Sequence, residues 1–190
     1  MEIGTQRLVL REWQDSDRDP FAAMSADHEV MQYLRALPTR ETCDAWIGFQ
    51  IANQARHGFC MWAVELRQSG AFVGAVGLVH VGFSASFTPA VEIGWRLARA
   101  TWGQGLATEA AREALAFGFA ELGFEQIVAY AAPANRASQN VMRKLGMSRD
   151  EAHDFDHPRQ PEGDPLRRQV LYRLASGQWS LATAAMSGNV

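Results

Sequence analysis

Two glycines stand between a predicted strand and a predicted helix in residues 91–108. The apolar alternation of residues 91–97 is typical of a strand, and Gly103 and Gly105 come just before a helical pattern. Glycines at such a junction remove side chains from the turn, so backbone N–H groups and the positive end of the helix dipole are exposed. The junction predicts a site for a phosphate or pyrophosphate, although a tight turn without a ligand would carry the same glycines.

Two common phosphate-binding motifs do not fit this junction. A P-loop requires a lysine after its last glycine, and no lysine follows here. A dinucleotide fingerprint requires Gly or Ala where this chain has Thr108, and it belongs to a fold of repeated strand–helix units. If the junction binds a phosphate, it belongs to another class of phosphate site.

The composition is that of an ordinary globular protein. Of 190 residues, 47% are hydrophobic and 21% charged, which fits one domain, residues 1–175, with a tail of unknown packing, residues 176–190. The net charge of −3 and the absence of a basic stripe argue against nucleic-acid binding. No apolar run approaches the roughly 18 residues of a membrane span, and no signal peptide is visible. We expect a cytoplasmic monomer or homodimer without a membrane partner, with Cys43 and Cys60 as reduced core residues.

The order of predicted elements indicates an α+β (mixed α/β) fold. Gly74 and Gly77 lie inside a predicted strand, which suggests a close backbone approach or a bulge. Only residues 91–132 form a clear strand–helix–strand unit, so we expect a seven-stranded, mostly antiparallel sheet with helices on its faces. The predicted strands are residues 5–13, 59–66, 72–81, 91–97, 125–132, 147–155 and 168–174. The predicted helices are residues 17–24, 28–34, 39–57, 105–122 and 135–145, and the buried face of the third is expected to carry Cys43, Trp46, Ile47, Ile51 and Ala55.

A second motif, residues 135–146, opens the helix after the next parallel strand. Asn135 is a suitable N-cap, and Gly146 closes the helix. Ser138 lies one turn further on. Two helix N-termini at neighbouring strand ends would leave room for a ligand between them. The two motifs together are much more specific than either alone.

With both motifs in place, the chain resembles the GNAT superfamily of acetyl-CoA-dependent N-acetyltransferases, and within it the branch of the ribosomal-protein N-terminal acetyltransferases. The resemblance extends from residues 5–11 to residues 170–174. The superfamily's pyrophosphate loop reads [Q/R]-x-x-G-x-[G/A], whose last two places are filled by Gly105 and Ala107. Trp102 stands at the first place, although W-G-x-G-x-A-T-E-A is familiar in this branch. The resemblance implies a GNAT-like domain whose sheet splays in the middle.

The resemblance also implies roles for individual residues. The pantetheine arm of CoA would insert as a pseudo-strand between residues 93–97 and 128–132. Asn135 would hydrogen-bond the pantetheine, and Ser138 would protonate the leaving thiolate, although both also suit a plain helix start. The residues implied in cofactor binding are Ile93, Trp95 and Leu97 along the pantetheine, Gly103, Gln104, Gly105, Leu106, Ala107 and Thr108 at the pyrophosphate, and Asn135.

Glu92 is the best candidate for a catalytic base. An acidic residue inside an apolar strand is costly to bury without a function, although a solvated strand residue would look the same in sequence. An acid in residues 150–156, above all Asp154 or Asp156, is the alternative base. His153 and His157 lie four apart but have no third ligand in sequence, so no metal is expected.

The expected activity is transfer of an acetyl group from acetyl-CoA to a primary amine by direct attack in a ternary complex. The acceptor is a protein or peptide α-amine or a small-molecule amine, and loops 83–89 and 156–167 are expected to shape its site. The alternative is a non-catalytic acyl-CoA-binding or regulatory module, which would need neither Glu92 nor Ser138. A nucleotide-dependent oxidoreductase is disfavoured by Thr108 and by the strand order.

Overall fold

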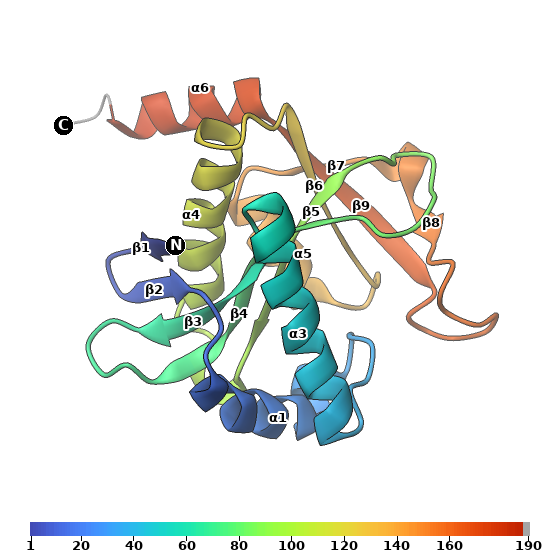
Figure 1. Ribbon diagram of the computed structural model, residues 1–190. Coiled ribbons are helices and arrows are strands. Elements are labelled where there is room, and N and C mark those ends of the chain that lie inside the picture. The colour runs from blue at the N-terminus through green and yellow to red at the C-terminus, as the bar shows by residue number, and fades with distance from the viewer. Residues whose placement is uncertain (188–190) are drawn as a thin grey trace. The chain divides into compact units, whose positions relative to one another are not determined.

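The computed structural model describes the backbone of residues 1–187 and the side chains of residues 1–181. The chain divides into two units: the first contains residues 1–79 and 93–114, and the second contains residues 80–92 and the chain from residue 115 onward. Strands β4 (Phe72–His80) and β5 (Val91–Leu97) and helix α4 (Leu106–Ala120), which are labelled in Figure 1, each begin in one unit and end in the other.

The first unit is built on an antiparallel meander in the order β1, β2, β3, β4. The predicted strand 5–13 is shorter than expected, because Thr5 N donates to Leu8 O at 2.9 Å and closes a turn. The residues before that turn form an additional strand. The elements of this unit are β1 (Glu2–Gly4), β2 (Leu8–Arg11), α1 (Arg18–Ala26), α2 (His28–Met31), α3 (Arg40–His57), β3 (Met61–Leu66), β4 (Phe72–His80), β5 (Val91–Leu97) and the start of α4 (Leu106–Ala120).

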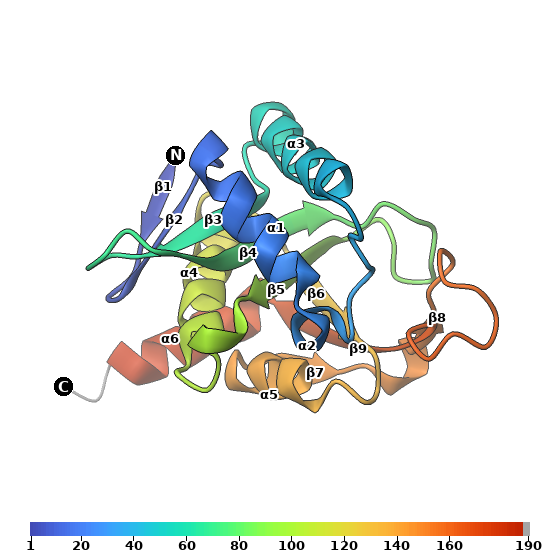
Figure 2. The same ribbon diagram turned by 90° about the horizontal axis from the view of Figure 1, so that it is seen from below.

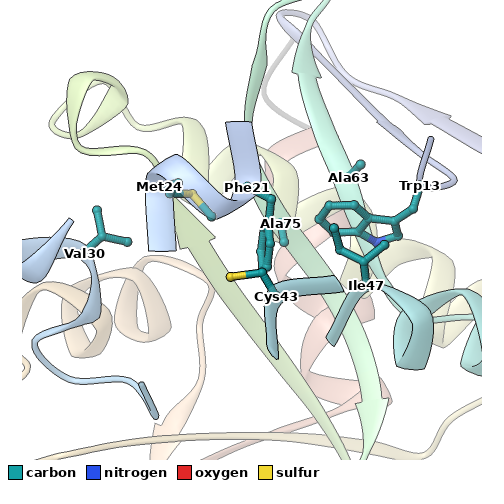
Figure 3. Packing of buried hydrophobic residues seen from close by; sticks show 8 residues of the cluster. All are labelled: Trp13, Phe21, Met24, Val30, Cys43, Ile47, Ala63 and Ala75. Atoms are coloured by element: carbon teal, nitrogen blue, oxygen red, sulfur yellow. The ribbon is translucent and has the colours of Figure 1, made fainter. Parts of the chain in front are cut away.

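Helices α1 and α3 cover one face of this sheet (Figure 2). Phe21 from α1 and Ile47 from α3 pack with Ala63 and Ala75 from β3 and β4, and the Trp13 ring meets the Phe21 ring edge to face at 5.3 Å (Figure 3). Apolar burial at this contact stabilises the unit. The predicted helix starting at residue 39 is confirmed.

The buried face of α3 differs from the predicted one. Cys43 and Ile47 are buried as expected, but Ile51 is 44% exposed. In its place Gln50 is buried and accepts a hydrogen bond from Met61 N at 3.0 Å, and Gln54 accepts one from Trp62 Nε1 at 2.9 Å. The prediction was wrong because hydrophobic periodicity expects an apolar residue at each core position. A glutamine can be buried there when its side chain accepts a hydrogen bond from a backbone N–H of a neighbouring strand.

Gly74 and Gly77 confirm the predicted close backbone approach. A Cβ at Gly74 would lie 2.2 Å from Arg96 O, and one at Gly77 would lie 2.1 Å from Cys60 O. Cys43 and Cys60 are both free and buried, as expected. Burial raises the pKa of Cys60 to about 12, so this thiol stays protonated.

The second unit is a sheet in which the start of β5 pairs in parallel with β6, and β6 pairs antiparallel with β9. The parallel register joins Val91 to Ile127 and Glu92 to Val128. Asn135 caps α5 by accepting from Ser138 N at 3.1 Å, which confirms that predicted helix start. The elements are β6 (Gln126–Ala131), α5 (Arg136–Lys144), β7 (Ser148–Arg149), β8 (Phe155–Asp156), β9 (Arg168–Ala175) and α6 (Ser176–Ser187).

The predicted strand 147–155 is wrong in its middle. Only β7 and β8 pair with β9, and residues 151–153 form a 3-10 turn between them. The carboxylate of Asp154 accepts from Leu171 N at 3.0 Å, and Asp150 N donates to Leu171 O at 2.8 Å. Side-chain acceptors thus replace part of the backbone ladder. With the additional β1, the described residues contain nine strands where seven were expected.

Residues 176–187, expected as part of a tail, form helix α6. Its Trp179 is 8% exposed and lies 5.9 Å from the Phe119 ring, so the start of this helix packs within the second unit. Residues 188–190 of the predicted tail lie outside the described residues.

Candidate active site

The glycine junction lies in the first unit, between a 3-10 turn at residues 99–101 and helix α4. Gly103 has φ +75° and Gly105 has φ +79°, left-handed values that favour glycine. The first-turn N–H groups of α4 have no partner within the helix, as at any helix start. Residues 103–108 therefore place backbone N–H donors at the positive end of a helix of 15 residues.

An ion pair between Arg7 and Glu109 holds this loop in place. Arg7 Nη1 donates to Gln104 O at 3.1 Å, and Arg7 Nη2 lies 2.6 Å from Glu109 Oε2. Glu109 also accepts from Thr5 Oγ1 at 2.5 Å and from Arg7 N at 2.8 Å. Burial would raise the pKa of Glu109, but these hydrogen bonds outweigh burial and lower the pKa. The sequence analysis missed this support, since Arg7 and Glu109 are 102 positions apart.

Trp102 stands where the loop pattern [Q/R]-x-x-G-x-[G/A] has Gln or Arg, and its contacts give a structural reason for the difference. Its Nε1 donates to Leu97 O at 2.8 Å, which ties the loop to the end of β5. Its side chain is otherwise 47% exposed. The indole therefore fixes the turn through a backbone carbonyl, and the row of N–H donors after it does not depend on a polar side chain at this position.

Glu92 lies in the second unit, on the first residues of β5. Its Oε2 atom is buried and has no hydrogen-bond partner among the described residues. Burial raises the pKa of Glu92 to about 7, while the hydrogen bond with the Tyr130 hydroxyl and the positive charge of Arg159 oppose the rise. A carboxyl with this pKa can take up a proton near neutral pH, which is the property of a general base.

The alternative bases are held by other partners. Asp150 lies 2.9 Å from His153 Nδ1 and also binds Arg173, contacts that lower its pKa. Asp156 lies 3.3 Å from Arg167 Nε, and Arg167 and Arg168 lower its pKa. Asp154 is used by Leu171 N and Arg149. Asp150 and Asp156 thus have lowered pKa values, whereas the pKa of Glu92 is raised.

Two loops expected to shape the acceptor site meet in the second unit. The Phe83 ring lies 4.6 Å from the His157 ring, and the guanidinium of Arg159 donates to Gly82 O. The Tyr130 ring, whose hydroxyl binds Glu92, lies 5.3 Å from Phe155. Aromatic side chains of these loops therefore lie next to Tyr130, the hydrogen-bond partner of the candidate base.

Asn135 and Ser138 occupy the first turn of α5, also in the second unit. The Asn135 side chain uses its oxygen to cap the helix, and its amide nitrogen is a donor that the cap does not use. Ser138 is half-buried. Gln139 next to it is buried and donates to Pro133 O at 2.9 Å, which fixes the loop that precedes the helix.

The remaining predicted residues belong to the part of β5 that lies in the first unit. Ile93 is 3% exposed and Leu97 is 6% exposed, while Trp95 is half-buried. The cofactor and catalytic residues predicted from the sequence thus fall into two groups: residues 93–108 in the first unit, and Glu92, Asn135 and Ser138 in the second.

His153 and His157 each have a hydrogen-bond partner within the protein. His153 binds Asp150, and His157 Nδ1 accepts from Arg159 N at 3.2 Å. Within residues whose side chains are described, no group of three or more His, Cys, Asp or Glu is placed to hold a metal ion. In the same part of the chain, no helix combines the length and apolar character needed to cross a membrane.

Comparisons with known proteins identify the family of the chain. Residues 7–148 match the family described as Acetyltransferase (GNAT) domain. The chain belongs to the GNAT acetyltransferase family, and its mixed α/β fold is the GNAT fold predicted from the sequence. It is an acetyltransferase.

Individual relatives cover most of the chain. It is 29% identical to the N-acetyltransferase YnaD of Bacillus subtilis, over 95% of this chain and 100% of that protein. It is 32% identical to the FsC-acetyl coenzyme A-N(2)-transacetylase of Aspergillus fumigatus, over 93% of this chain and 77% of that protein. A GNAT-family acetyltransferase structure from Bacillus anthracis superposes with a TM-score of 0.76 at 25% identity, over 93% and 99% of the two chains.

The expected similarity to ribosomal-protein acetyltransferases is visible in the fold. The ribosomal L7/L12 α-N-protein acetyltransferase RimL, solved in complex with coenzyme A, superposes with a TM-score of 0.74 over 92% of this chain and 98% of its own. At 16% identity this likeness concerns the fold alone.

Proposed function

We propose that this enzyme transfers the acetyl group of acetyl-CoA to a primary amine by direct attack in a ternary complex, with Glu92 as the general base. The observation that carries the proposal is the carboxyl of Glu92, whose buried Oε2 has no hydrogen-bond partner among the residues described and whose pKa is raised to about 7. A module that only binds acyl-CoA has no need for such a group, since burying an unpaired carboxyl costs stability.

The demand on the base depends on the acceptor. An amine must be neutral to attack a thioester. Deprotonating a lysine side chain with pKa near 10.4 costs roughly 4.6 kcal/mol at pH 7, whereas an α-amine with pKa near 7.8 costs only about 1 kcal/mol. A carboxylate with a pKa near 7 matches the α-amine, because proton transfer is most efficient between groups of similar pKa. We therefore favour an α-amine or another amine of low pKa.

In the proposed reaction, the amine nitrogen attacks the thioester carbonyl carbon, and the C–S bond breaks as the tetrahedral intermediate collapses. Glu92 takes the proton from nitrogen, directly or through water. Backbone N–H groups of residues 93–95 are candidates to stabilise the oxyanion. The thiolate leaves toward the positive end of α5, where Ser138 supplies a proton.

Acetyl-CoA itself is proposed to bind through the groups described above. The N–H groups of residues 103–108 suit its pyrophosphate, since they combine left-handed glycines with a helix N-terminus. The amide nitrogen of Asn135 would donate to the pantetheine. Ile93, Trp95 and Leu97 would lie along the same arm, where the strands are expected to splay.

The test is the Glu92→Gln variant with acetyl-CoA and a panel of primary amines, followed by release of the CoA thiol. Gln has the same shape but cannot accept the proton, so kcat should fall about 10²–10⁴-fold while acetyl-CoA affinity is unchanged. Wild-type kcat/KM should rise with pH through the titration of Glu92 near 7 and of the acceptor amine, and the variant should keep only the rise that belongs to the acceptor amine. Normal turnover of Glu92→Gln with the best acceptor would exclude Glu92 as the base.

A further inference from the structure

Tyr130 on β6 and Glu92 on β5 lie on the same face of the sheet in the second unit. The parallel register places Glu92 beside Val128, and Tyr130 follows Val128 by two residues. Side chains alternate along a strand, so residues two apart point to the same face. The phenol of Tyr130 is therefore a diagonal neighbour of the Glu92 carboxyl across the two strands.

The Tyr130 hydroxyl is the hydrogen-bond partner of the Glu92 carboxyl. Burial and the neighbouring Glu92 carboxylate raise the pKa of Tyr130 above its usual range, so the hydroxyl keeps its proton and acts as the donor. The Oε2 atom of Glu92 has no hydrogen-bond partner among the described residues. The phenol thus satisfies part of the carboxyl and leaves Oε2 for another group.

Three phenylalanines hold the Tyr130 ring. Its centre lies 5.3 Å from that of Phe155 and 6.0 Å from that of Phe83, both edge to face, and 6.5 Å from that of Phe87. All of these side chains belong to one hydrophobic cluster of the second unit. Aromatic rings packed in this way favour defined orientations, so the hydroxyl at the tip of the Tyr130 ring has a defined position. The cluster therefore fixes the direction from which the hydroxyl reaches Glu92.

Cationic side chains near the pair act less directly. Arg159, on the loop after β8, lowers the pKa of Glu92 through its positive charge and opposes the rise at Tyr130. His157 on the same loop has its ring 6.2 Å from the Tyr130 ring, and its Nδ1 accepts from Arg159 N at 3.2 Å. Arg173 on β9 is engaged in an ion pair. Arg159 thus affects the carboxyl by its charge, whereas Tyr130 contacts it.

We propose that Tyr130 is a positioning residue, whose hydroxyl orients the Glu92 carboxyl so that Oε2 takes the proton of the attacking amine. The inference rests on the proposed function, in which Glu92 is the general base. In that step an N–H bond of the amine breaks and an O–H bond forms at Oε2, directly or through water. The O–H bond of Tyr130 stays intact, so Tyr130 acts through Glu92 and exchanges no proton with the substrate.

The first test uses Tyr130→Phe, which keeps the ring and its aromatic contacts and removes only the hydroxyl. The pKa of Glu92 is read from the carbon-13 NMR shift of its labelled carboxyl, with Glu92→Gln identifying the resonance. The hydrogen bond lowers this pKa, so losing the hydroxyl should raise the pKa from about 7 to about 8. This measurement needs neither acetyl-CoA nor an acceptor.

The second test measures kcat of the same variant at pH 9, where Glu92 is largely ionised in both proteins. A raised pKa alone would leave this kcat unchanged or slightly higher, because a stronger base accepts a proton more readily. Loss of orientation should lower kcat about threefold to tenfold and leave the KM for acetyl-CoA unchanged. The pH at which kcat/KM rises should move upward with the pKa of Glu92.

Tyr172→Phe is the matched control. Tyr172, on β9, is also buried in the second unit, and its hydroxyl donates to Gln139 Oε1 at 3.5 Å. This variant loses a hydroxyl that has no role at Glu92, so the pKa of Glu92 and kcat should equal those of wild type. If the Tyr130 hydroxyl were purely structural, Tyr130→Phe would lower the melting temperature and leave both the pKa and kcat unchanged.

The two measurements separate this inference from the proposed function. An unchanged pKa of Glu92 in Tyr130→Phe, or a raised pKa with an unchanged kcat at pH 9, would overturn the positioning role. If wild type acetylates no primary amine, the proposed function fails, and the NMR titration still decides whether Tyr130 holds the Glu92 carboxyl. An unchanged pKa would then refute that contact, and a raised pKa would show that the contact exists without the proposed reaction.

Discussion

Replacing Glu92 by Gln should remove a large pH dependence from the stability of the fold. Burial raises the pKa of Glu92 from 4.5 to about 7 in the folded chain. The folded state therefore binds this proton more tightly than the unfolded state does. Its contribution to stability is complete below about pH 4.5 and is lost as the pH rises through about 7. Glutamine stays neutral and cannot show this loss.

The size of the effect follows from the two pKa values. At ~1.36 kcal/mol per pKa unit, the shift from 4.5 to about 7 corresponds to about 3 kcal/mol of unfolding free energy. Most of it, roughly 2.5 kcal/mol, is lost between pH 5 and pH 8. Since a domain is stable by only about 5–15 kcal/mol, the loss is easily measured.

The assay is urea unfolding of wild type and Glu92→Gln at pH 5, 6, 7 and 8. The stability of the variant relative to wild type should rise by roughly 2.5 kcal/mol across this range, because all other titrating groups are shared and cancel in the difference. Glu125→Gln, an exposed carboxyl on the same unit, is the control and should follow wild type. Parallel curves for Glu92→Gln and wild type would mean that the carboxyl is well solvated, and the argument for Glu92 as base would lose its physical ground.

Three further substitutions test the thioester side. Gly105→Val should abolish the rise in melting temperature that acetyl-CoA causes, because it adds a branched side chain to the donor loop at φ +79°. Gly58→Val is the control: it has the same φ at the end of α3, and its melting temperature should still rise with acetyl-CoA. Equal responses of the two variants would refute a role for the loop. Glu109→Gln removes the ion pair with Arg7 behind the loop, so the KM for acetyl-CoA should rise about threefold to tenfold with kcat unchanged; an unaltered KM would show that the loop holds its shape alone. Ser138→Ala should lower kcat about tenfold to a hundredfold and leave the affinity for acetyl-CoA unchanged, since a thiol of pKa near 8.5 is a modest leaving group. A loss of stability with an unchanged kcat would show that Ser138 is a structural residue.

Much of the fold could be predicted because local signals at the ends of elements are strong. Thr39 and Asn135 cap their helices with the side-chain hydrogen bonds that their residue types favour. Gly58 ends α3 in the left-handed conformation. Gly74 and Gly77 mark places where a backbone carbonyl leaves no room for a Cβ. Each of these signals needs only a few neighbouring residues, so it can be read without knowing the tertiary structure.

The contacts that the sequence did not predict join distant residues through polar groups. Gln50 occupies a core position of α3 because Met61 N on β3 needs an acceptor. Arg7 supports Gln104, 97 positions away, and Glu109, 102 positions away. Hydrophobic periodicity ranks positions by apolar character and cannot see that a polar side chain is satisfied by a partner far along the chain. Such errors are therefore concentrated at buried polar residues.

Buried polar atoms without partners also distinguish functional from structural charge. Where the protein uses a buried charge to stabilise its fold, as in Arg11 with Asp17 and Glu65, the partners are built into the chain. On β5, the Oε2 atom of Glu92 is buried and has no hydrogen-bond partner among the described residues. Leaving such an atom unpaired costs stability, so its retention is best explained by a partner that arrives from solution. For Glu92 the proposed partner is the proton of the attacking amine.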